Sequence, residues 1–272
     1  MVVADLHTHT TASDGDFSPA EVVAHARRRN LHAVAVTDHD TLAGVPAESD
    51  GLRVVPGVEV SADLDGRETH VLGLFVRPDH RPLVDHLAAV CERRRERFRG
   101  YLTGLRANGA DIPGELVAAV EASATSLGRR HLAGLLLKAG LAKTRYDAFA
   151  RFLHPLAGTV PAIHLTPAAD AIALLREAGG VVALAHPRRQ VTADDLTRFR
   201  DLGGQAVEVV YPAALVGHTQ RLRGLCKQLG LAVAGGSDCH GAEVGRGVGS
   251  RGVTRDEFAA LEALAGRVAQ PV

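Results

Sequence analysis

Short apolar segments of strand length alternate with helical segments along most of the chain. The apolar segments lie near residues 2–6, 33–36, 54–60, 69–76, 181–185, 206–210 and 231–234. The helix after the first of them is marked by Ser18-Pro19-Ala20-Glu21, which offers an N-cap, a proline at the first helical position and a capping-box glutamate. This alternation is typical of a parallel sheet covered by helices and predicts an α/β fold.

Several of the predicted strands end in histidine or aspartate. The residues at these strand ends are His7, His9, Asp38, His39, His186, Asp238 and His240. In a barrel of parallel strands, the carboxyl ends of the strands and the loops that follow them form the active face. We therefore expect these residues, which are far apart in the sequence, to converge on one rim of a barrel.

The pattern changes between about residues 82 and 161. Helices are predicted near 83–105, 114–124, 131–139 and 148–153, and no strand is predicted among them. Strand and helix alternate again afterwards, starting with a helix capped by Thr166-Pro167. The sequence therefore predicts a barrel built from residues 1–95 and 162–272, with a small helical insert at 96–161.

The composition excludes several classes of protein. The 272 residues are 46% hydrophobic, enough to bury a large core, and Lys+Arg and Asp+Glu both number 31. Zero net charge indicates no general attraction to nucleic acid or to membranes. Three cysteines without paired spacing, no apolar run of about 18 residues and no leader-like start predict a cytoplasmic protein without disulfides or a membrane span. The oligomeric state stays open.

The histidines and acids at the strand ends suit a metal site. His7 and His9 lie on one side of an extended segment, because side chains alternate there, and both can bind one ion. Imidazole and carboxylate ligands suit Zn, Fe or Mn. Any one of these residues alone is more simply explained as a packed side chain or a helix cap. Packing does not readily explain six histidines and four acids together at the strand ends and in the adjoining loops. The set comprises His7, His9, His39, His70, His186 and His240 with Asp14, Asp38, Glu59 and Asp238.

All of these residues except Asp14 stand in six short motifs in a fixed order. The motifs are His7-Thr8-His9, Thr37-Asp38-His39, Gly57-Val58-Glu59, Thr69-His70, Ala185-His186-Pro187 and Gly236-Ser237-Asp238-Cys239-His240-Gly241. Together they resemble those of the PHP (polymerase and histidinol phosphatase) superfamily of metal-dependent phosphoesterases. The resemblance implies a distorted (β/α)7 TIM-like barrel with two to three divalent metal ions, Mn, Fe or Zn.

The resemblance also implies a role for each ligand. One ion would be held by His7, His9, Glu59 and Asp238. Glu59 would bridge to a second ion, which His70 and His186 also hold, and Asp14, His39 and His240 would hold a third. Clustered divalent ions neutralise phosphate oxygens and activate water, so attack by a metal-bound hydroxide is expected, with Glu59, Asp238 and His240 as catalytic residues. Alternation along the segment points Cys239 away from its neighbours, which predicts a packed side chain and not a thiolate.

The insert carries the segment Gly128-Arg129-Arg130-His131. A helical insert followed by such a segment resembles the PHP branch that hydrolyses nucleotide phosphates, which includes 3′,5′-nucleoside bisphosphate phosphatases, nucleoside monophosphate phosphohydrolases and 5′→3′ exoribonucleases of short RNA. That branch usually has proline where Arg130 stands, and a Tyr-Val-Pro stretch where this chain has residues 158–162. Arg129, His131 and Arg188 are predicted to bind substrate phosphate, because a guanidinium fork matches phosphate oxygens.

The predicted function is hydrolysis of a phosphate ester on a small nucleotide or on the 5′ end of a short oligonucleotide, and not on a long duplex. Three alternatives stay open: a phosphatase of small metabolites such as histidinol phosphate, a metal-dependent amide or lactone hydrolase, and a non-catalytic metal-binding module. The arginine-rich stretch at 93–99 is interleaved with Glu92 and Glu96, which predicts an exposed, salt-bridged helix face and not an RNA-docking surface.

Overall fold

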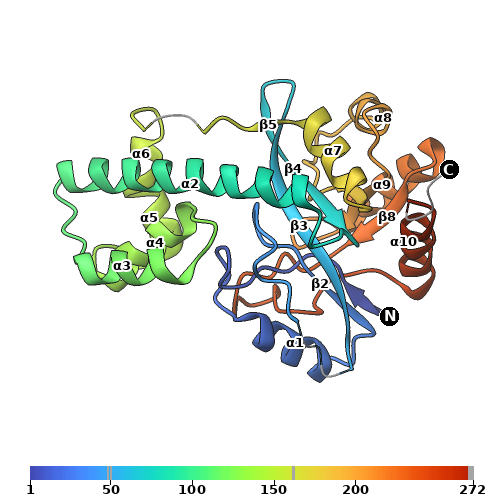
Figure 1. Cartoon of the computed structure of the whole chain (residues 1–272), viewed down its shortest axis with the longest axis horizontal. Helices are drawn as coiled ribbons and strands as arrows, with labels where there is room; N and C mark the ends of the chain where they lie inside the picture. Colours follow the sequence, from blue (N-terminus) through green and yellow to red (C-terminus); the bar gives the residue numbers. More distant parts are fainter. Residues whose placement is uncertain (48, 50, 161–162, 269–272) are drawn as a thin grey trace.

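The computed structural model describes residues 1–47, 49, 51–160 and 163–268 (Figure 1). One sheet forms its centre, with the strand order β1-β2-β3-β4-β6-β7-β8 and a short β5 paired to the end of β3. The strands are β1 (Ala4–Asp5), β2 (Ala33–Val36), β3 (Arg53–Leu64), β4 (Arg67–Leu74), β5 (Thr166–Pro167), β6 (Val181–Leu184), β7 (Ala206–Val210) and β8 (Ala232–Gly235). The strands of the path correspond to those of the predicted (β/α)7 barrel.

The two ends of this strand order meet, so the sheet forms a nearly closed barrel. The N–H of Leu6 donates to Gly235 O at 3.1 Å, and the N–H of His9 donates to Cys239 O at 2.9 Å. These bonds join the residues after β1 to the end of β8 and to the loop beyond it. The predicted α/β class and distorted barrel are confirmed.

The strand β4 runs antiparallel to both of its neighbours, which corrects the prediction of a parallel sheet. Asp65 and Gly66 connect β3 to β4, with φ angles of 58° and 75°. An Asp-Gly pair with two positive φ angles forms the tight turn of a hairpin, which replaces the expected crossover helix. Because β4 starts at the rim where β3 ends, His70 still lies at the predicted active face.

Helices cover the barrel on the outside: α1 (Pro19–Arg28), α7 (Ala168–Glu177), α8 (Ala193–Asp201) and α9 (Val216–Leu229). The last helix, α10 (Arg255–Val268), instead packs Phe258 and Leu261 into the apolar cluster of the barrel interior. The predicted capping box of α1 is present, because Ser18 and Glu21 each accept a hydrogen bond from the other's backbone N–H. The predicted cap of α7 is not. Thr166 belongs to β5, and the N-cap, Pro167, makes no side-chain capping bond.

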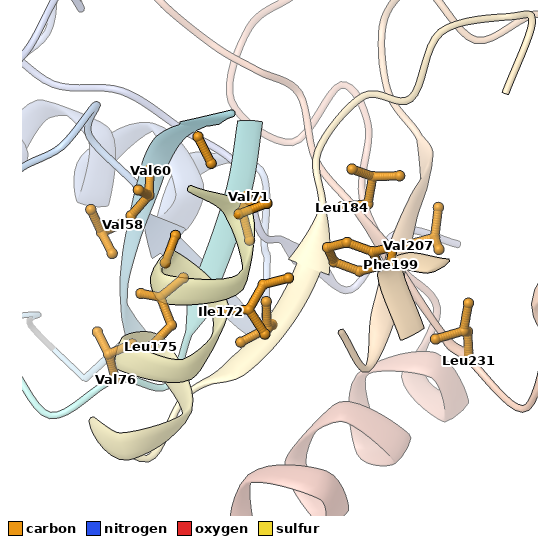
Figure 2. Packing of buried hydrophobic residues seen from close by; sticks show 14 of the residues in the cluster. Val58, Val60, Val71, Val76, Ile172, Leu175, Leu184, Phe199, Val207 and Leu231 are labelled. Carbon is orange, nitrogen blue, oxygen red and sulfur yellow. The ribbon is translucent and has the colours of Figure 1, made fainter. Parts of the chain in front are cut away.

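The buried strands contribute to two apolar layers, because successive side chains point to opposite faces. In β6, Val181 and Ala183 face the barrel interior, whereas Val182 and Leu184 face the outer helices. The outer layer includes Phe199 and residues of α7 that pack against Val58 and Val60 (Figure 2). Apolar packing on both faces of the sheet therefore holds the strands, and the rim formed by their ends, in place.

The insert has an apolar core of its own. Its helices are α2 (Arg81–Ala107), α3 (Gly114–Ser123), α4 (Arg129–Lys138), α5 (Arg145–Ala148), the π-helix η1 (Phe149–Leu153) and α6 (His154–Leu156). The long α2 belongs to both units: Leu83 and Leu87 pack in the barrel core, and Phe98 and Leu105 pack in the insert core. Figure 1 shows α2 extending from the barrel to the insert. The predicted end of the insert at residues 161–162 lies outside the described residues.

As predicted, residues 82–160 contain helices and no strand, and the structure describes that whole range. None of the helices in the described part of the chain is both long and apolar enough to cross a membrane.

The close approach of β8 to β1 gives the first prediction. A Cβ at Gly236 would lie 2.4 Å from His7 N and 2.3 Å from His7 Cβ, so Gly236→Ala forces the barrel seam apart. We expect this variant to lose about 1–3 kcal/mol of unfolding free energy, measured by urea denaturation. The matched control is Gly224→Ala, in an exposed part of α9 with nothing within 4 Å of the added atom, which should gain stability. Equal stability of the two variants would contradict the close approach.

Candidate metal centre

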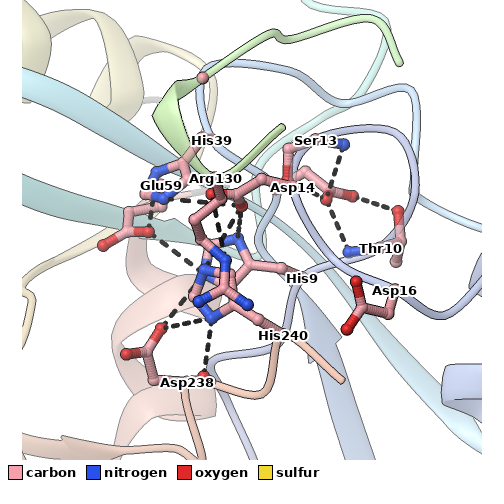
Figure 3. A network of polar contacts seen from close by, with 12 residues as sticks. His9, Thr10, Ser13, Asp14, Asp16, His39, Glu59, Arg130, Asp238 and His240 are labelled. Atoms are coloured by element: carbon pink, nitrogen blue, oxygen red, sulfur yellow. Dashed lines mark hydrogen bonds and ion pairs between the residues drawn. The ribbon is translucent and has the colours of Figure 1, made fainter. Parts of the chain in front are cut away.

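The residues predicted to bind metal converge at one rim of the barrel, and most of them are drawn in Figure 3. His7, His9 and Asp14 follow β1, His39 follows β2, Glu59 and His70 lie within β3 and β4, His186 follows β6, and Asp238 and His240 follow β8. The structure therefore brings together side chains that are more than 200 positions apart, as the strand-end pattern predicts.

The tightest group contains His7, His9, Glu59 and Asp238. Nε2 of His7 lies 3.2 Å from Nε2 of His9, and both nitrogens lie 3.3 Å from Glu59 Oε2. Asp238 Oδ1 lies 3.6 Å from the first nitrogen and 3.4 Å from the second. Four ligand atoms placed tetrahedrally at ~2.1 Å from a cation would lie ~3.4 Å from one another. His7, His9 and Glu59 therefore have the spacing of a metal-binding group, and Asp238 lies beside both histidines.

Glu59 faces a second set of histidines with its other oxygen. Oε1 lies 2.9 Å from Nδ1 of His70 and 2.8 Å from Nε2 of His186. The side chain of Glu59 is fully buried, so both of its oxygens are surrounded by protein. One carboxylate thus lies between two groups of nitrogen ligands, which is the arrangement of a bridging ligand.

A third group surrounds Asp14. Its Oδ1 lies 3.3 Å from Nε2 of His240, 3.9 Å from Nε2 of His39 and 3.9 Å from Nδ1 of His9. His39 also approaches the centre, with Nδ1 3.0 Å from Glu59 Oε2. His9 and His39 therefore lie between the three groups and make them one continuous cluster.

Hydrogen bonds outside the cluster fix which ring nitrogens face it. Nδ1 of His240 lies 2.9 Å from the backbone oxygen of Asp238, and only an N–H can donate to that oxygen. The tautomer with a proton on Nδ1 leaves the lone pair of Nε2 facing Asp14. A histidine whose other nitrogen donates to a carbonyl or carboxylate is the usual form of a metal ligand.

Glu208, which was not predicted from the sequence, orients the ring of His7 in the same way and also holds the backbone of His186. Its Oε1 lies 3.1 Å from Nδ1 of His7, and its Oε2 accepts from the backbone N–H of His186 at 2.6 Å. His186 has a φ of 26°, in a region that non-glycine residues rarely adopt, and this hydrogen bond helps to hold it there. The available signal was one fully buried acid within the apolar strand Ala206–Val210.

Asp38, the remaining acid of the motifs, positions a loop. It accepts hydrogen bonds from the backbone N–H groups of Thr10 at 2.7 Å and Ser13 at 3.2 Å, and from the Thr10 hydroxyl at 2.7 Å. These bonds shape the loop that presents Asp14 to the cluster (Figure 3).

The charges at the centre balance one another. Burial by itself raises the pKa of Glu59, but His39, His7 and His70 outweigh it and hold the pKa well below the usual range. Burial also raises the pKa of Asp14, and His240 and His39 reverse that effect in the same way. Both carboxylates are therefore ionised at neutral pH, as metal ligands must be.

Four ligand atoms in the cluster are buried without a hydrogen bond in the described part of the chain. They are His9 Nδ1, Asp14 Oδ1, His39 Nδ1 and Glu59 Oε2. Buried polar atoms are nearly always paired, and lone pairs gathered in one place repel one another. A divalent cation is the partner that satisfies them, so the residues present fit a metal centre.

Two of the cavities that border the cluster share Glu68, His70 and Arg129. One, of about 220 Å³, lies between the rim and the insert, and the other, of about 420 Å³, lies beside β4 and the segment after His186. Arg188 also lines the second cavity. The structure thus brings Arg129 and Arg188, both predicted to bind phosphate, to one cavity beside the metal-binding residues.

His131, the third residue predicted to bind phosphate, lies apart from them. It borders a different cavity, together with Asp14 and Arg130, and its Nδ1 accepts the backbone N–H of Gly128 at 3.1 Å. This contact caps the start of α4. Binding of a substrate phosphate by His131 stays a prediction.

The arginine-rich stretch is not the exposed, self-paired face that the sequence analysis predicts. Arg94 points inward with 14% of its side chain exposed, and its Nε lies 2.6 Å from Asp40 Oδ2. Its Nη2 also donates to Ser61 Oγ at 2.8 Å. Arg99 pairs with Glu121 of α3. Tertiary partners, which helix spacing does not reveal, have replaced the expected pairs with Glu92 and Glu96.

The prediction for Cys239 is confirmed. The residue is fully buried among apolar side chains, and burial raises the pKa of its thiol to about 11. The thiol is therefore protonated at neutral pH and unsuited to nucleophilic attack.

Comparison with known proteins identifies the family of this chain. The PHP domain model matches residues 5–129. A 5′-3′ exoribonuclease of Salmonella typhimurium is 36% identical over 88% of this chain and 85% of its own length. A 3′,5′-nucleoside bisphosphate phosphatase of Chromobacterium violaceum is 30% identical over 92% of this chain and 91% of its own length. The chain belongs to the PHP family. As the motifs predict, this PHP protein is an enzyme that hydrolyses phosphoric esters.

Solved structures share the fold of this PHP protein over nearly its whole length. A proposed metal-dependent phosphoesterase of Bifidobacterium adolescentis superimposes with a TM-score of 0.87 at 28% identity, covering 96% of each chain. An amidohydrolase of Chromobacterium violaceum with bound sulfate superimposes with a TM-score of 0.83 at 27% identity and the same coverage. Both matches include the insert as well as the barrel.

The contacts of Glu208 give the second prediction. In Glu208→Gln the side chain keeps its shape, but one carboxylate oxygen is replaced by an amide N–H₂ group. That group cannot accept a hydrogen bond, so the contact with either His7 Nδ1 or the His186 backbone N–H is lost. We expect Mn²⁺ affinity, measured by activity titration after chelation, to fall about 10–100-fold while the protein stays folded. Glu121→Gln, in α3 of the insert, serves as the control and should keep the wild-type affinity. A Glu208→Gln variant with Mn²⁺ affinity within twofold of the wild type would contradict this role.

Proposed function

We propose that this PHP protein releases inorganic phosphate from small nucleotides, with nucleoside 3′,5′-bisphosphates as the preferred substrates. Short RNA with a 5′ phosphate is the second proposed substrate class. Two or three divalent ions, Mn, Fe or Zn, are proposed as cofactors, held by the nine cluster residues in the groups described above.

The observation that carries this proposal is the position of Arg129 between the two cavities, beside His70. A nucleoside bisphosphate has two phosphates, and only one of them can occupy the metal centre. The cavity beside β4 offers Arg67, Arg129 and Arg188 to the other phosphate. Guanidinium groups bind phosphate oxygens through paired hydrogen bonds, which suits them to orient the substrate without taking part in bond cleavage.

The proposed catalytic residues are Glu59, Asp238 and His240. Divalent ions bound here would polarise the phosphate ester and lower the pKa of a water molecule next to it. Glu59 holds the two halves of the cluster at a fixed separation, because its two oxygens face different histidines. Asp238 and His240 come from one loop after β8, so the rim can present both on the same side of the ester.

The limited space above the rim favours a small substrate. The insert, proposed to comprise residues 96–161, shares a cavity with the cluster at the start of α4. Arg94, just before the insert in α2, binds Asp40 of the barrel. We propose that the insert selects the substrate while the barrel carries the chemistry. Zero net charge provides no long-range attraction for a long polyanion. The names of the Salmonella and Chromobacterium relatives agree with short RNA and nucleoside bisphosphates as substrates.

The third prediction concerns Arg129. Removing its guanidinium in Arg129→Ala should lower kcat/KM on adenosine 3′,5′-bisphosphate about 10–100-fold, as expected for a charged hydrogen bond to phosphate. An aryl phosphate, which has no second phosphate, should lose much less. Arg99→Ala, which removes an exposed arginine of α2, is the control for general effects on the insert. Equal losses on both substrates would mean that Arg129 supports the fold or the metals instead.

The substrate panel gives the fourth prediction. Phosphate release is measured with Mn²⁺ at equal concentrations of adenosine 3′,5′-bisphosphate, AMP, short 5′-phosphorylated RNA, histidinol phosphate and an aryl phosphate. We expect the bisphosphate to have the highest kcat/KM. If histidinol phosphate exceeds every nucleotide tenfold or more, which is about 1.4 kcal/mol of transition-state free energy, the nucleotide proposal is wrong.

A further inference from the structure

The cavity of about 220 Å³ has two chemically different walls. One wall belongs to the metal-binding cluster and includes His39 and His240, and the other belongs to the insert and includes Phe149 of the π-helix. We propose that this cavity binds the nucleobase of the substrate, with the Tyr101 hydroxyl and the Arg97 guanidinium at the edge of the base. This proposal rests on the nucleotide phosphatase function proposed above and identifies where that enzyme would bind the base of its substrate.

One stripe of α2 forms much of the insert wall. Arg94, Arg97, Phe98 and Tyr101 follow the spacing that places helical side chains on one face, and all four line the cavity. Arg94 fixes the start of the stripe to the barrel through Asp40. Tyr101 lies seven residues further on, about 10 Å along the helix axis. A ribose whose phosphate is at the rim can therefore extend its base along this stripe.

Two polar groups in this wall are buried without a hydrogen bond among the described residues. Tyr101 is 1% exposed, and both its hydroxyl oxygen and Nε of Arg97 make no hydrogen bond. The guanidinium carbon of Arg97 lies 5.7 Å from the centre of the Tyr101 ring, so the two groups are neighbours. An unpaired hydroxyl and an unpaired N–H at one cavity wall point to a ligand with hydrogen-bonding groups on its edge.

Apart from the arginines at the start of α4, the rest of the insert wall is apolar and partly aromatic. Phe98 and Phe149 line it together with Leu127 and Leu132, all of them from the core of the insert. Aromatic walls with a few polar groups bind planar heterocycles, because a base can stack on a ring while its edge makes hydrogen bonds. Arginines line this cavity too, but Arg94 pairs with Asp40, and Arg130 pairs with Asp14 and Glu243. We therefore assign the second phosphate to the cavity on the other side of His70, which Arg67 and Arg188 line.

The test compares two substrates that differ only in the base. The value of kcat/KM is measured on adenosine 3′,5′-bisphosphate and on the base-free 1-deoxyribose 3,5-bisphosphate, for the wild type, Tyr101→Phe and Arg97→Gln. The wild type should prefer the nucleotide by tenfold or more, and each variant should lower this preference about 5–10-fold, since a site that hydrogen-bonds its ligand loses selectivity when a partner is removed. Tyr146→Phe, at an 83% exposed tyrosine of α5, should keep the wild-type preference.

Three other results would each overturn the proposal. A wild type that hydrolyses both substrates equally well has no base subsite, although its phosphoesterase function would stand. Variants that lose the same factor on both substrates would show that Tyr101 and Arg97 support only the insert core. A wild type that hydrolyses neither compound, but does hydrolyse an aryl phosphate, would overturn the proposed nucleotide function along with the subsite. Thermal unfolding of each variant, compared with the wild type, separates these results from loss of the fold.

Discussion

The two oxygens of Glu59 face two separate sets of histidine nitrogens, and the rest of the site is arranged around this carboxylate. Glu59 is fully buried within the longest strand of the sheet, where an isolated negative charge would be strongly unfavourable. Three neighbouring histidines hold its pKa low. Divalent cations would neutralise the same charge more completely. The barrel can tolerate such a residue at its rim because the strand ends bring its partners within 2.8–3.3 Å of it.

Several residues outside the cluster hold its side chains in position. Glu208 orients His7 and holds the backbone of His186, and Asp38 shapes the loop that carries Asp14. Arg94 connects the insert to the rim through Asp40. These three anchors come from different elements, so the proposed metal ligands are positioned by contacts from β7, from the loop after β2 and from α2.

The strands and the candidate site were predictable from the sequence, because they depend on local patterns and short motifs. Apolar runs located the strands, and the strand-end histidines and acids located the rim, because strand ends in such a barrel share one face. The antiparallel β4 was missed although its signal, Asp65-Gly66, is a typical hairpin turn. Glu208 was also visible as one acid within an apolar strand. The burial of Arg94 was not predictable from helix spacing, because its partner Asp40 lies 54 residues away and depends on the tertiary fold.

The most direct test of the metal centre is anomalous X-ray diffraction at the manganese edge from crystals of the active enzyme grown with Mn²⁺. We predict at least two anomalous peaks within the cluster, about 3.5–4 Å apart. One of them should lie ~2.0–2.3 Å from Nε2 of His7, Nε2 of His9 and Oε2 of Glu59. Crystals of active enzyme without an anomalous peak among these side chains would contradict the metal centre and the mechanism based on it.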